Sequence, residues 1–150
     1  MANKIVLKGR GLVDGVAEGE ALVSKESLVW SHGVDPTNGN IDDVRVDVYG
    51  QCVKEKVLIY PLGKGSTSGA TWMLETTRCG NAPKAIINCE TELIILAGAL
   101  LSEALYHVCI PVVDQFNQNP AEVIGTGDWV KIDGAKGIVE VTKKEHRSNV

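Results

Sequence analysis

Several features that mark specialised protein classes are missing from this 150-residue sequence. The longest apolar run, Leu93 to Leu101, is far shorter than the ~20 residues of a membrane-spanning helix. Fifteen Lys and Arg residues stand against nineteen Asp and Glu, and they form no basic stripe for nucleic-acid phosphates. The N-terminal stretch lacks the apolar segment of a secretory signal, because Lys4, Lys8 and Arg10 interrupt it. We therefore expect a cytoplasmic protein that binds neither membrane nor nucleic acid.

Aromatic residues and metal-binding motifs are also scarce. There is only one Phe, so we expect aliphatic side chains to build the core. The four cysteines have no C-x-x-C pair among them, and no two histidines stand at metal-ligand spacing; these cysteines are Cys52, Cys79, Cys89 and Cys109. The sequence thus predicts four reduced, buried thiols and no metal site on this chain.

What is present predicts a single β-rich α/β domain over residues 1–150. No repeat, low-complexity tract or Pro/Gly/Ser linker divides the chain, and 44% hydrophobic with 23% charged residues is typical of a globular protein. Short runs rich in β-branched or aliphatic residues predict strands at 4–9, 19–25, 27–30, 56–61, 84–88, 110–114, 128–133 and 137–142. Helical spacing and a glycine stop predict a helix from about Ser68 to Gly80, and a second helix falls within 90–107.

The stretch "PLGKGSTSGATW", residues 61–72, connects a predicted buried strand to the first predicted helix. Three familiar glycine motifs fail to match it. A phosphate-binding P-loop needs glycine where Leu58 stands and Ser or Thr where Gly65 stands. The dinucleotide-binding pattern ends on a glycine where this chain has Ser68, and the nucleophile elbow carries Thr67 in place of serine.

A physical description of this loop remains. Glycines let the backbone turn tightly and approach a ligand, and the following helix presents free N–H groups and the positive end of its dipole. This arrangement favours an anionic ligand or an oxyanion. The alternative is a helix N-terminus capped by hydroxyl side chains with no ligand, since Ser and Thr are preferred caps.

Five ordered blocks carry a family resemblance. They are "GVDPTNGNIDD", "KVLIYPLGKGSTSG", "PKAIIN", "AGALL" followed by "IPVVD", and "IGTGDWVKIDG", spread from about Ala17 to Val139. Together they resemble the small subunit, or swivel domain, of the aconitase X family. The resemblance implies a swivelling β/β/α domain with about two helices. It also implies a hydro-lyase (dehydratase) that is active only with a large subunit, which carries an iron–sulfur cluster or iron.

The resemblance further implies roles for the loop residues. Ser66, the first serine after the second glycine, corresponds to the base that removes the substrate proton. The neighbouring positions would bind a small anionic substrate: Gly63, Lys64, Gly65, Thr67 and Ser68. Plainer roles stay open, because an isolated loop lysine is usually solvated and hydroxyls often only cap helices. Turn formation is at least as plausible as substrate contact for Asp35, Asn38 and Asp42, and His32 has no visible partner.

Two activities divide the aconitase X family, and the sequence carries signals for both. The segment from Glu103 to Tyr106 loosely resembles enzymes that dehydrate cis-3-hydroxy-L-proline, which is the activity we expect. The "PLGKGSTSG" loop looks closer to enzymes that dehydrate mevalonate 5-phosphate, which is the alternative. Two further alternatives are a non-catalytic assembly or regulatory subunit and a free-standing anion-binding module. A subunit of a larger enzyme should also expose an apolar face.

Overall fold

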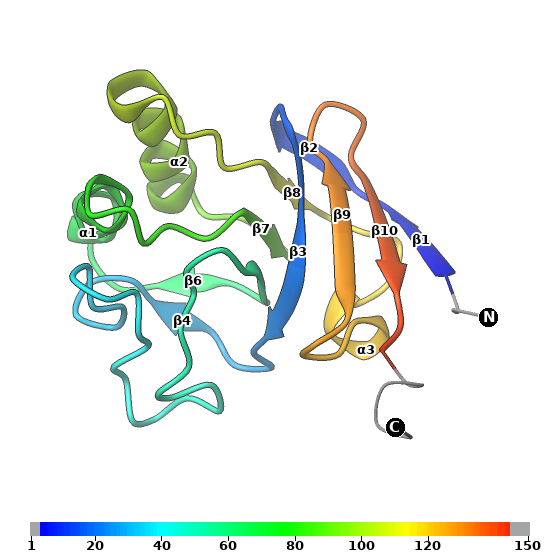
Figure 1. The fold of residues 1–150 in the computed structure, drawn as a ribbon, viewed down its shortest axis with the longest axis horizontal. Coiled ribbons are helices and arrows are strands. Elements are labelled where there is room, and N and C mark those ends of the chain that lie inside the picture. Colours follow the sequence, from blue (N-terminus) through cyan, green and yellow to red (C-terminus); the bar gives the residue numbers. More distant parts are fainter. Residues whose placement is uncertain (1–3, 145–150) are drawn as a thin grey trace.

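An eight-stranded mixed sheet organises the computed structural model, which describes residues 4–144 (Figure 1). The strand order is β1-β10-β9-β3-β5-β7-β8-β2. In chain order these strands are β1 (Lys4–Lys8), β2 (Arg10–Val13), β3 (Val16–Val23), β5 (Val57–Tyr60), β7 (Ala85–Asn88), β8 (Val112–Asp114), β9 (Trp129–Asp133) and β10 (Ile138–Thr142). A separate small sheet pairs β4 (Leu28–Val29) with β6 (Gly63–Lys64). The helices are α1 (Ser68–Arg78), α2 (Leu93–Tyr106) and α3 (Pro120–Val123).

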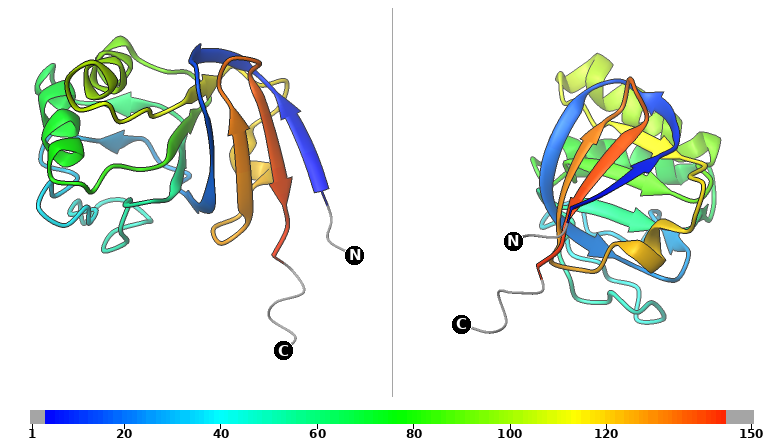
Figure 2. Two further views of the ribbon diagram at one scale, coloured as in Figure 1. Left: turned by 45° about the horizontal axis from the view of Figure 1, so that its top comes forward. Right: turned by 90° about the vertical axis from the view of Figure 1, so that its right-hand side faces the viewer.

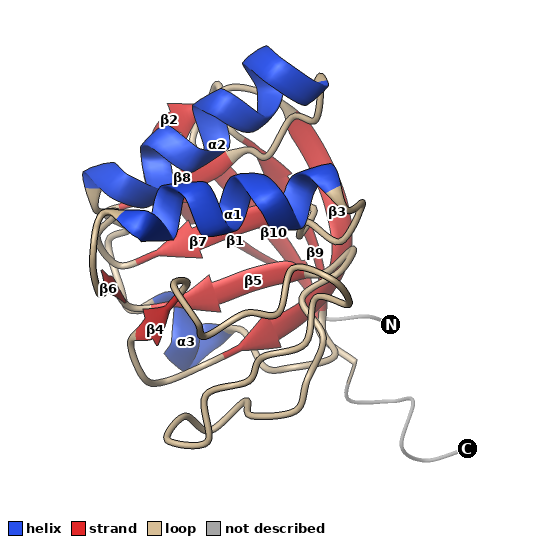
Figure 3. Ribbon diagram, turned by 90° about the vertical axis from the view of Figure 1, so that its left-hand side faces the viewer, coloured by secondary structure: helices blue, strands red, loops and turns tan. Residues whose placement is uncertain are grey.

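The middle of the sheet is parallel. Strands β3, β5, β7 and β8 run in the same direction, and every residue of β5 and β7 is buried, as their continuous apolar sequences predict. Helices α1 and α2 form the connections β5-α1-β7 and β7-α2-β8, and they lie side by side over one face of these strands (Figure 3). Because both helices follow parallel strands, their N-termini lie at the same edge of the sheet.

The antiparallel strands β1, β10 and β9 join this unit through β3. Residues 16–20 of β3 pair antiparallel with β9, and residues 21–23 pair parallel with β5. Helices α1 and α2 therefore lie at one end of the molecule and the antiparallel strands β1, β10 and β9 at the other (Figure 2). This arrangement confirms the expected β-rich α/β fold with two main helices.

The core has two parts, one on each face of the parallel strands. Leu58 and Ile86 point toward the helices and belong to the same cluster as Met73 of α1. Ile59 and Ile87, the next residues along the same strands, point to the opposite cluster beside the antiparallel strands. Successive side chains of a strand point to opposite faces, so these short strands contribute to both clusters. Both clusters are mainly aliphatic, as expected from the scarcity of Phe.

Three elements and the exposure of the cysteines differ from the predictions made from the sequence. Strands β2 and β6 and helix α3 were not predicted. Three of the cysteines are half-buried and Cys109 is exposed, so the prediction of buried thiols is wrong. None of the four lies within a named strand or helix: Cys79 and Cys89 directly follow α1 and β7, and Cys52 and Cys109 lie in connections.

Helix α2 forms within the predicted range and buries Ile95, but several of its leucine side chains face outward. Leu93 is 79% exposed and Leu105 is 57% exposed. The two helices approach closely at Gly98. A Cβ on Gly98 would come within 2.9 Å of the sulfur of Met73 in α1. Within the described residues no helix is long and apolar enough to cross a membrane. The outward apolar face of α2 therefore needs another explanation.

Candidate active site

The glycine-rich loop is held beside the end of β4. The register pairs Leu28 with Gly63 and Val29 with Lys64, so the residues after β4 lie alongside those after β6. Gly65 follows with φ of +110°, a conformation that side-chain-bearing residues rarely adopt. A Cβ on Gly65 would lie 3.0 Å from Val29 Cγ1. The turn that presents the serines thus depends on a glycine at this position.

Three serine hydroxyls form a hydrogen-bonded chain at the loop. Ser66 Oγ lies 2.6 Å from Ser68 Oγ, and Ser68 Oγ lies 2.7 Å from Ser31 Oγ. Ser66 and Ser68 are exposed and Ser31 is half-buried. The structure therefore brings the predicted base and one predicted binding residue together with a serine from a distant part of the sequence.

A buried hydrogen bond joins the two segments that carry these serines. Trp30, which precedes Ser31, donates its indole N–H to the Tyr60 hydroxyl at 3.1 Å. Both side chains are fully buried, and burial raises the pKa of Tyr60 to about 12. Tyr60 ends β5 just before the loop begins. The two segments that carry the serines are thus joined within the core.

The backbone at the start of α1 is open to a ligand. Among the described residues, no acceptor is found for the N–H groups of Ser66, Thr67 and Ser68. Thr67 is the N-cap residue, and its side chain makes no capping hydrogen bond. The alternative of a plain hydroxyl cap therefore has no hydrogen bond at Thr67 to support it. Free N–H groups and the helix dipole favour negative charge here.

Charged side chains of both signs surround the loop. The guanidinium of Arg45 bonds to Asp43 at 2.8 and 3.0 Å, which holds the pKa of Asp43 below its usual value, and the nearby positive charge of Lys64 adds to this effect. Lys64 itself is exposed, and no ion pair to it is found within the described residues. Glu92 packs against Gly63, where a Cβ would lie 2.7 Å from Glu92 Oε1, and burial raises the pKa of Glu92.

The polar residues after β4 make turns. Asp35 Oδ1 accepts hydrogen bonds from both the backbone N–H and the hydroxyl of Thr37, which lower the pKa of Asp35. Asn38 Oδ1 accepts from the backbone N–H of Asn40. These contacts support the turn interpretation for Asp35 and Asn38, while the Asp42 side chain is exposed.

His32 and Ser31 lie at the edge of the site. The His32 ring packs against the ring of Trp72 of α1 in a tilted arrangement, with ring centroids 4.4 Å apart, and His32 has a positive φ of 64°. Ser31 was not predicted. The one signal for Ser31 in the sequence is that it directly follows the short strand predicted at 27–30. Ser66 similarly comes after the strand predicted at 56–61.

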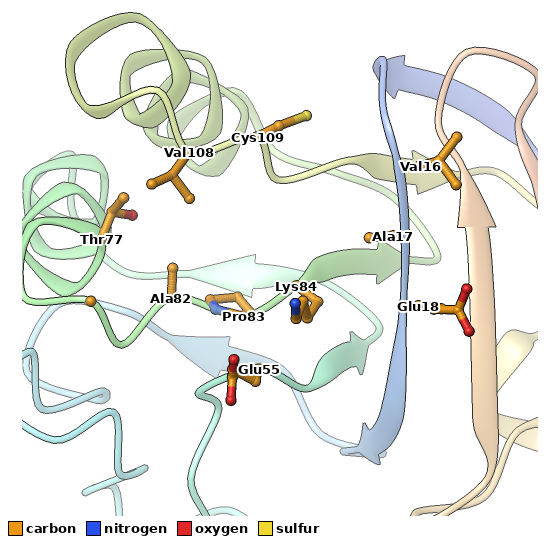
Figure 4. Close-up of a pocket in the computed structure, with 11 residues that line it drawn as sticks. Val16, Ala17, Glu18, Glu55, Thr77, Ala82, Pro83, Lys84, Val108 and Cys109 are labelled. Carbon is orange, nitrogen blue, oxygen red and sulfur yellow. The ribbon is translucent and has the colours of Figure 1, made fainter.

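A pocket of about 540 Å³ lies at the opposite edge of the parallel strands (Figure 4). Its lining includes residues just before β5, β7 and β8, among them Glu55, Lys84 and Cys109. It contains none of the loop residues 63–68. The candidate site is instead an exposed surface group, as expected for a site that a second chain completes.

No metal-binding cluster accompanies the serines. Over residues 4–144 no three His, Cys, Asp or Glu side chains are grouped so that they could hold a metal ion. The loop can bind a ligand through hydroxyls, backbone N–H groups and one lysine, and these groups favour an anion over a cation.

Known proteins share both this sequence and this fold. Residues 6–141 match the family described as the aconitase X swivel domain. The chain belongs to this family. The crystal structure of Thermococcus kodakaraensis aconitase X in its holo-form matches with a TM-score of 0.84 and 39% identity, covering 93% of this chain and 99% of that chain. The resemblance drawn from the five sequence blocks is thereby confirmed.

Curated relatives carry a more specific name. A phosphomevalonate dehydratase small subunit of Methanosarcina acetivorans is 41% identical over 139 residues, covering 93% of this chain and 92% of the relative. Another, of Thermococcus kodakarensis, is 40% identical over 135 residues, covering 90% of this chain and 95% of the relative. Both matches therefore extend over nearly the full length of each chain.

These relatives do not support our first choice of substrate, cis-3-hydroxy-L-proline. That choice depended on residues 103–106, which form the last turn of α2. The Ser66 loop adjoins the opposite end of this helix, and ten residues of helix span about 15 Å. The segment that suggested hydroxyproline therefore lies away from the candidate site.

Proposed function

We propose that this chain is the small subunit of a dehydratase that acts on mevalonate 5-phosphate together with a large subunit. The observation that carries the proposal is the match, along nearly the whole of both chains, to relatives named phosphomevalonate dehydratase small subunit. The exposed hydroxyl group at the start of α1 supports it, because a base that acts on a substrate held by another chain must lie at the surface.

Ser66 is the base in this proposal. Its alkoxide takes the proton from the carbon next to the substrate carboxylate, and the electrons of that C–H bond form the new C=C bond. The C–O bond to the hydroxyl on the neighbouring carbon breaks, and its electron pair leaves with the oxygen as hydroxide. Return of the proton from Ser66 converts this hydroxide to water and restores the alkoxide. A serine is a weak base at its ordinary pKa, so its charged form needs stabilisation. The free N–H groups at the start of α1 and the helix dipole supply it.

The remaining loop residues bind the anionic substrate. Lys64 provides a positive charge for a carboxylate or a phosphate, and the hydroxyls of Thr67 and Ser68 can donate hydrogen bonds. Gly63 and Gly65 contribute through their backbone: Gly65 makes the turn that presents the serines, and Gly63 leaves room for Glu92 beside the loop. The overall charge of the chain is -4, so attraction for an anion must come from this local group.

A metal centre, iron or an iron–sulfur cluster, belongs to the large subunit in this proposal. It would act as a Lewis acid on the leaving hydroxyl. The residues of this chain fit a supporting role, since the loop offers N–H groups, hydroxyls and a lysine but no set of metal ligands.

The apolar face of α2 is the part of the surface that we assign to contact with the large subunit. Leu93 begins this face directly after Glu92, which packs against Gly63 of the loop. Leu100, Leu101 and Leu105 continue it along the helix. A specific interface buries roughly 800 Å² on each partner, so the contact must extend beyond this one helix. The face is continuous with the serine loop, so the partner that covers one covers both.

The proposal is tested by supplying both substrates to this chain assembled with its large subunit and loaded with metal. We expect mevalonate 5-phosphate to be dehydrated with a kcat/KM at least about 10²-fold above that for cis-3-hydroxy-L-proline, because a site that pairs a charged group of its substrate rejects molecules that lack it. The reverse preference would restore the hydroxyproline alternative. Turnover of neither substrate would favour the non-catalytic subunit, and substrate binding by this chain alone would favour the anion-binding module.

A further inference from the structure

Ser31 is the anchored end of the serine chain. It follows β4 and the fully buried Trp30, whose indole bonds to Tyr60 in the core. Ser66, by contrast, lies on an exposed loop directly after a glycine of positive φ. The hydrogen bond between Ser31 and Ser68 therefore connects the buried part of the structure to the exposed hydroxyls at the surface.

The direction of each hydrogen bond among the three hydroxyls depends on the others. A hydroxyl has one proton to donate, so Ser68 can donate to only one of its two neighbours at a time. When Ser66 is an alkoxide, Ser68 donates to Ser66, and Ser31 then donates to Ser68. When Ser66 is protonated, this order can reverse. Hydrogen bonds to a charged oxygen are about twice as strong as neutral ones, and chains of them strengthen one another.

We infer that Ser31 is a positioning residue that acts through Ser68 to orient the Ser66 hydroxyl and to stabilise its deprotonated form. This inference depends on the proposed function, in which Ser66 is the base. Ser31 does not touch the substrate. It fixes Ser68, and Ser68 then presents its proton to Ser66 rather than to water.

Several titratable and charged groups lie on the segments that carry these hydroxyls or pack against the loop. They are His32 beside Ser31, Lys64 on the loop, Asp43 paired with Arg45, and Glu92 against Gly63. None of them changes when Ser31 is replaced by another neutral residue. A shift in the pH dependence of the reaction in such a variant therefore reports on the hydroxyl chain.

The experiment measures kcat, KM and the pH profile of the assembled enzyme with mevalonate 5-phosphate. In Ser31→Ala we expect kcat to fall about 10- to 100-fold with KM changed less than about threefold, as expected for lost transition-state stabilisation. The pH limb that reports deprotonation of the base should move to higher pH. Ser31→Thr, which keeps the hydroxyl, should retain most of the activity, and Thr71→Ala, an exposed hydroxyl further along α1, should have no effect.

A double-mutant cycle tests whether Ser31 acts through Ser68. In a Ser68→Ala background, Ser31→Ala should cost nothing further, because the chain is already broken. Equal losses in both backgrounds would overturn the inference, as would an unchanged kcat and pH profile in Ser31→Ala. Ser66→Ala, measured alongside, separates the two proposals: if it abolishes turnover while Ser31→Ala is silent, only the positioning role fails. If Ser66→Ala is fully active, the proposed base fails as well.

Discussion

Gly65 is the residue whose backbone most directly determines where Ser66 lies. Its φ of +110° disfavours any side chain, and a Cβ would approach Val29 Cγ1 at 3.0 Å. We predict that Gly65→Ala lowers kcat of the assembled enzyme at least about tenfold, because small displacements of catalytic groups are costly.

Gly50 offers a matched control for Gly65. It also has a positive φ, of +85°, but nothing lies within 4 Å of its added Cβ. Both alanine variants should lose about 1–2 kcal/mol of stability from backbone strain, measured by urea unfolding. Only Gly65→Ala should lose activity. Equal kcat values in the two variants would show that the loop tolerates the change.

Asp128 is a buried carboxylate that holds the end of β10. It is 3% exposed and accepts hydrogen bonds from the Lys143 ammonium at 2.6 Å, the Gly125 N–H at 2.8 Å and the Lys144 N–H at 3.0 Å. Burial alone raises the pKa of Asp128, but the bonds to Lys143 and to the two backbone groups outweigh it and leave the pKa lowered. We predict that Asp128→Asn loses about 2–3 kcal/mol of stability at pH 7.

The lowered pKa of Asp128 also sets the direction of a pH dependence. A carboxyl with a depressed folded-state pKa stabilises the protein above its unfolded pKa of about 3.9. That contribution is lost as the pH falls through the folded pKa. Urea unfolding between pH 7 and pH 3 should therefore show a loss of stability in the wild type that is smaller in Asp128→Asn. The exposed control Asp42→Asn should follow the wild type, and a mutant curve parallel to the wild type would contradict this account.

At the scale of elements, α2 is the helix that exposes the most large apolar side chains. We predict that the double variant Leu93→Gln, Leu101→Gln weakens assembly with the large subunit at least tenfold in Kd, because both side chains lose apolar contact there. The stability of the isolated chain should change by less than about 0.5 kcal/mol per site. Binding can be measured by titration calorimetry.

The control for α2 is Val6→Gln, which changes an apolar residue, 60% exposed, on β1 at the far end of the sheet. It should leave assembly unchanged. Unaltered affinity in the α2 variant would remove this helix from the interface. Sedimentation of the chain alone adds a second check: if the wild type dimerises and the variant does not, a second copy rather than the large subunit covers α2.

The elements also show which parts of the fold the sequence could predict. Strands β5 and β7 were recognisable because continuous apolar runs of strand length are typical of buried parallel strands. The two-residue strands β4 and β6 carry no periodic signal, so their pairing, and with it the contact of Ser31 with Ser68, could not be foreseen. The length of the segment around "LIILAGALL" and the four-residue spacing of Leu93, Ala97, Leu101 and Leu105 predict a helix. Because the segment is apolar on all sides, the pattern does not predict which side is exposed.

At the scale of the whole molecule, the parallel strands separate two edges with different properties. One edge carries the serine loop and the N-termini of α1 and α2, and the other carries the pocket beside Glu55 and Lys84. The sequence could predict that the loop joins a strand to a helix, because the strand and the glycine stop of α1 were both visible. It could not predict how the site is completed, because in our proposal the remaining groups lie on another chain.

The central claim is that this chain supplies the base of the reaction. The most direct test is the turnover of mevalonate 5-phosphate by Ser66→Ala assembled with the metal-loaded large subunit, with Kd for assembly measured on the same samples. The account predicts an intact complex whose kcat is lower by about 10²- to 10⁴-fold, the usual contribution of a general base. An intact Ser66→Ala complex that turns over as fast as the wild type would contradict it.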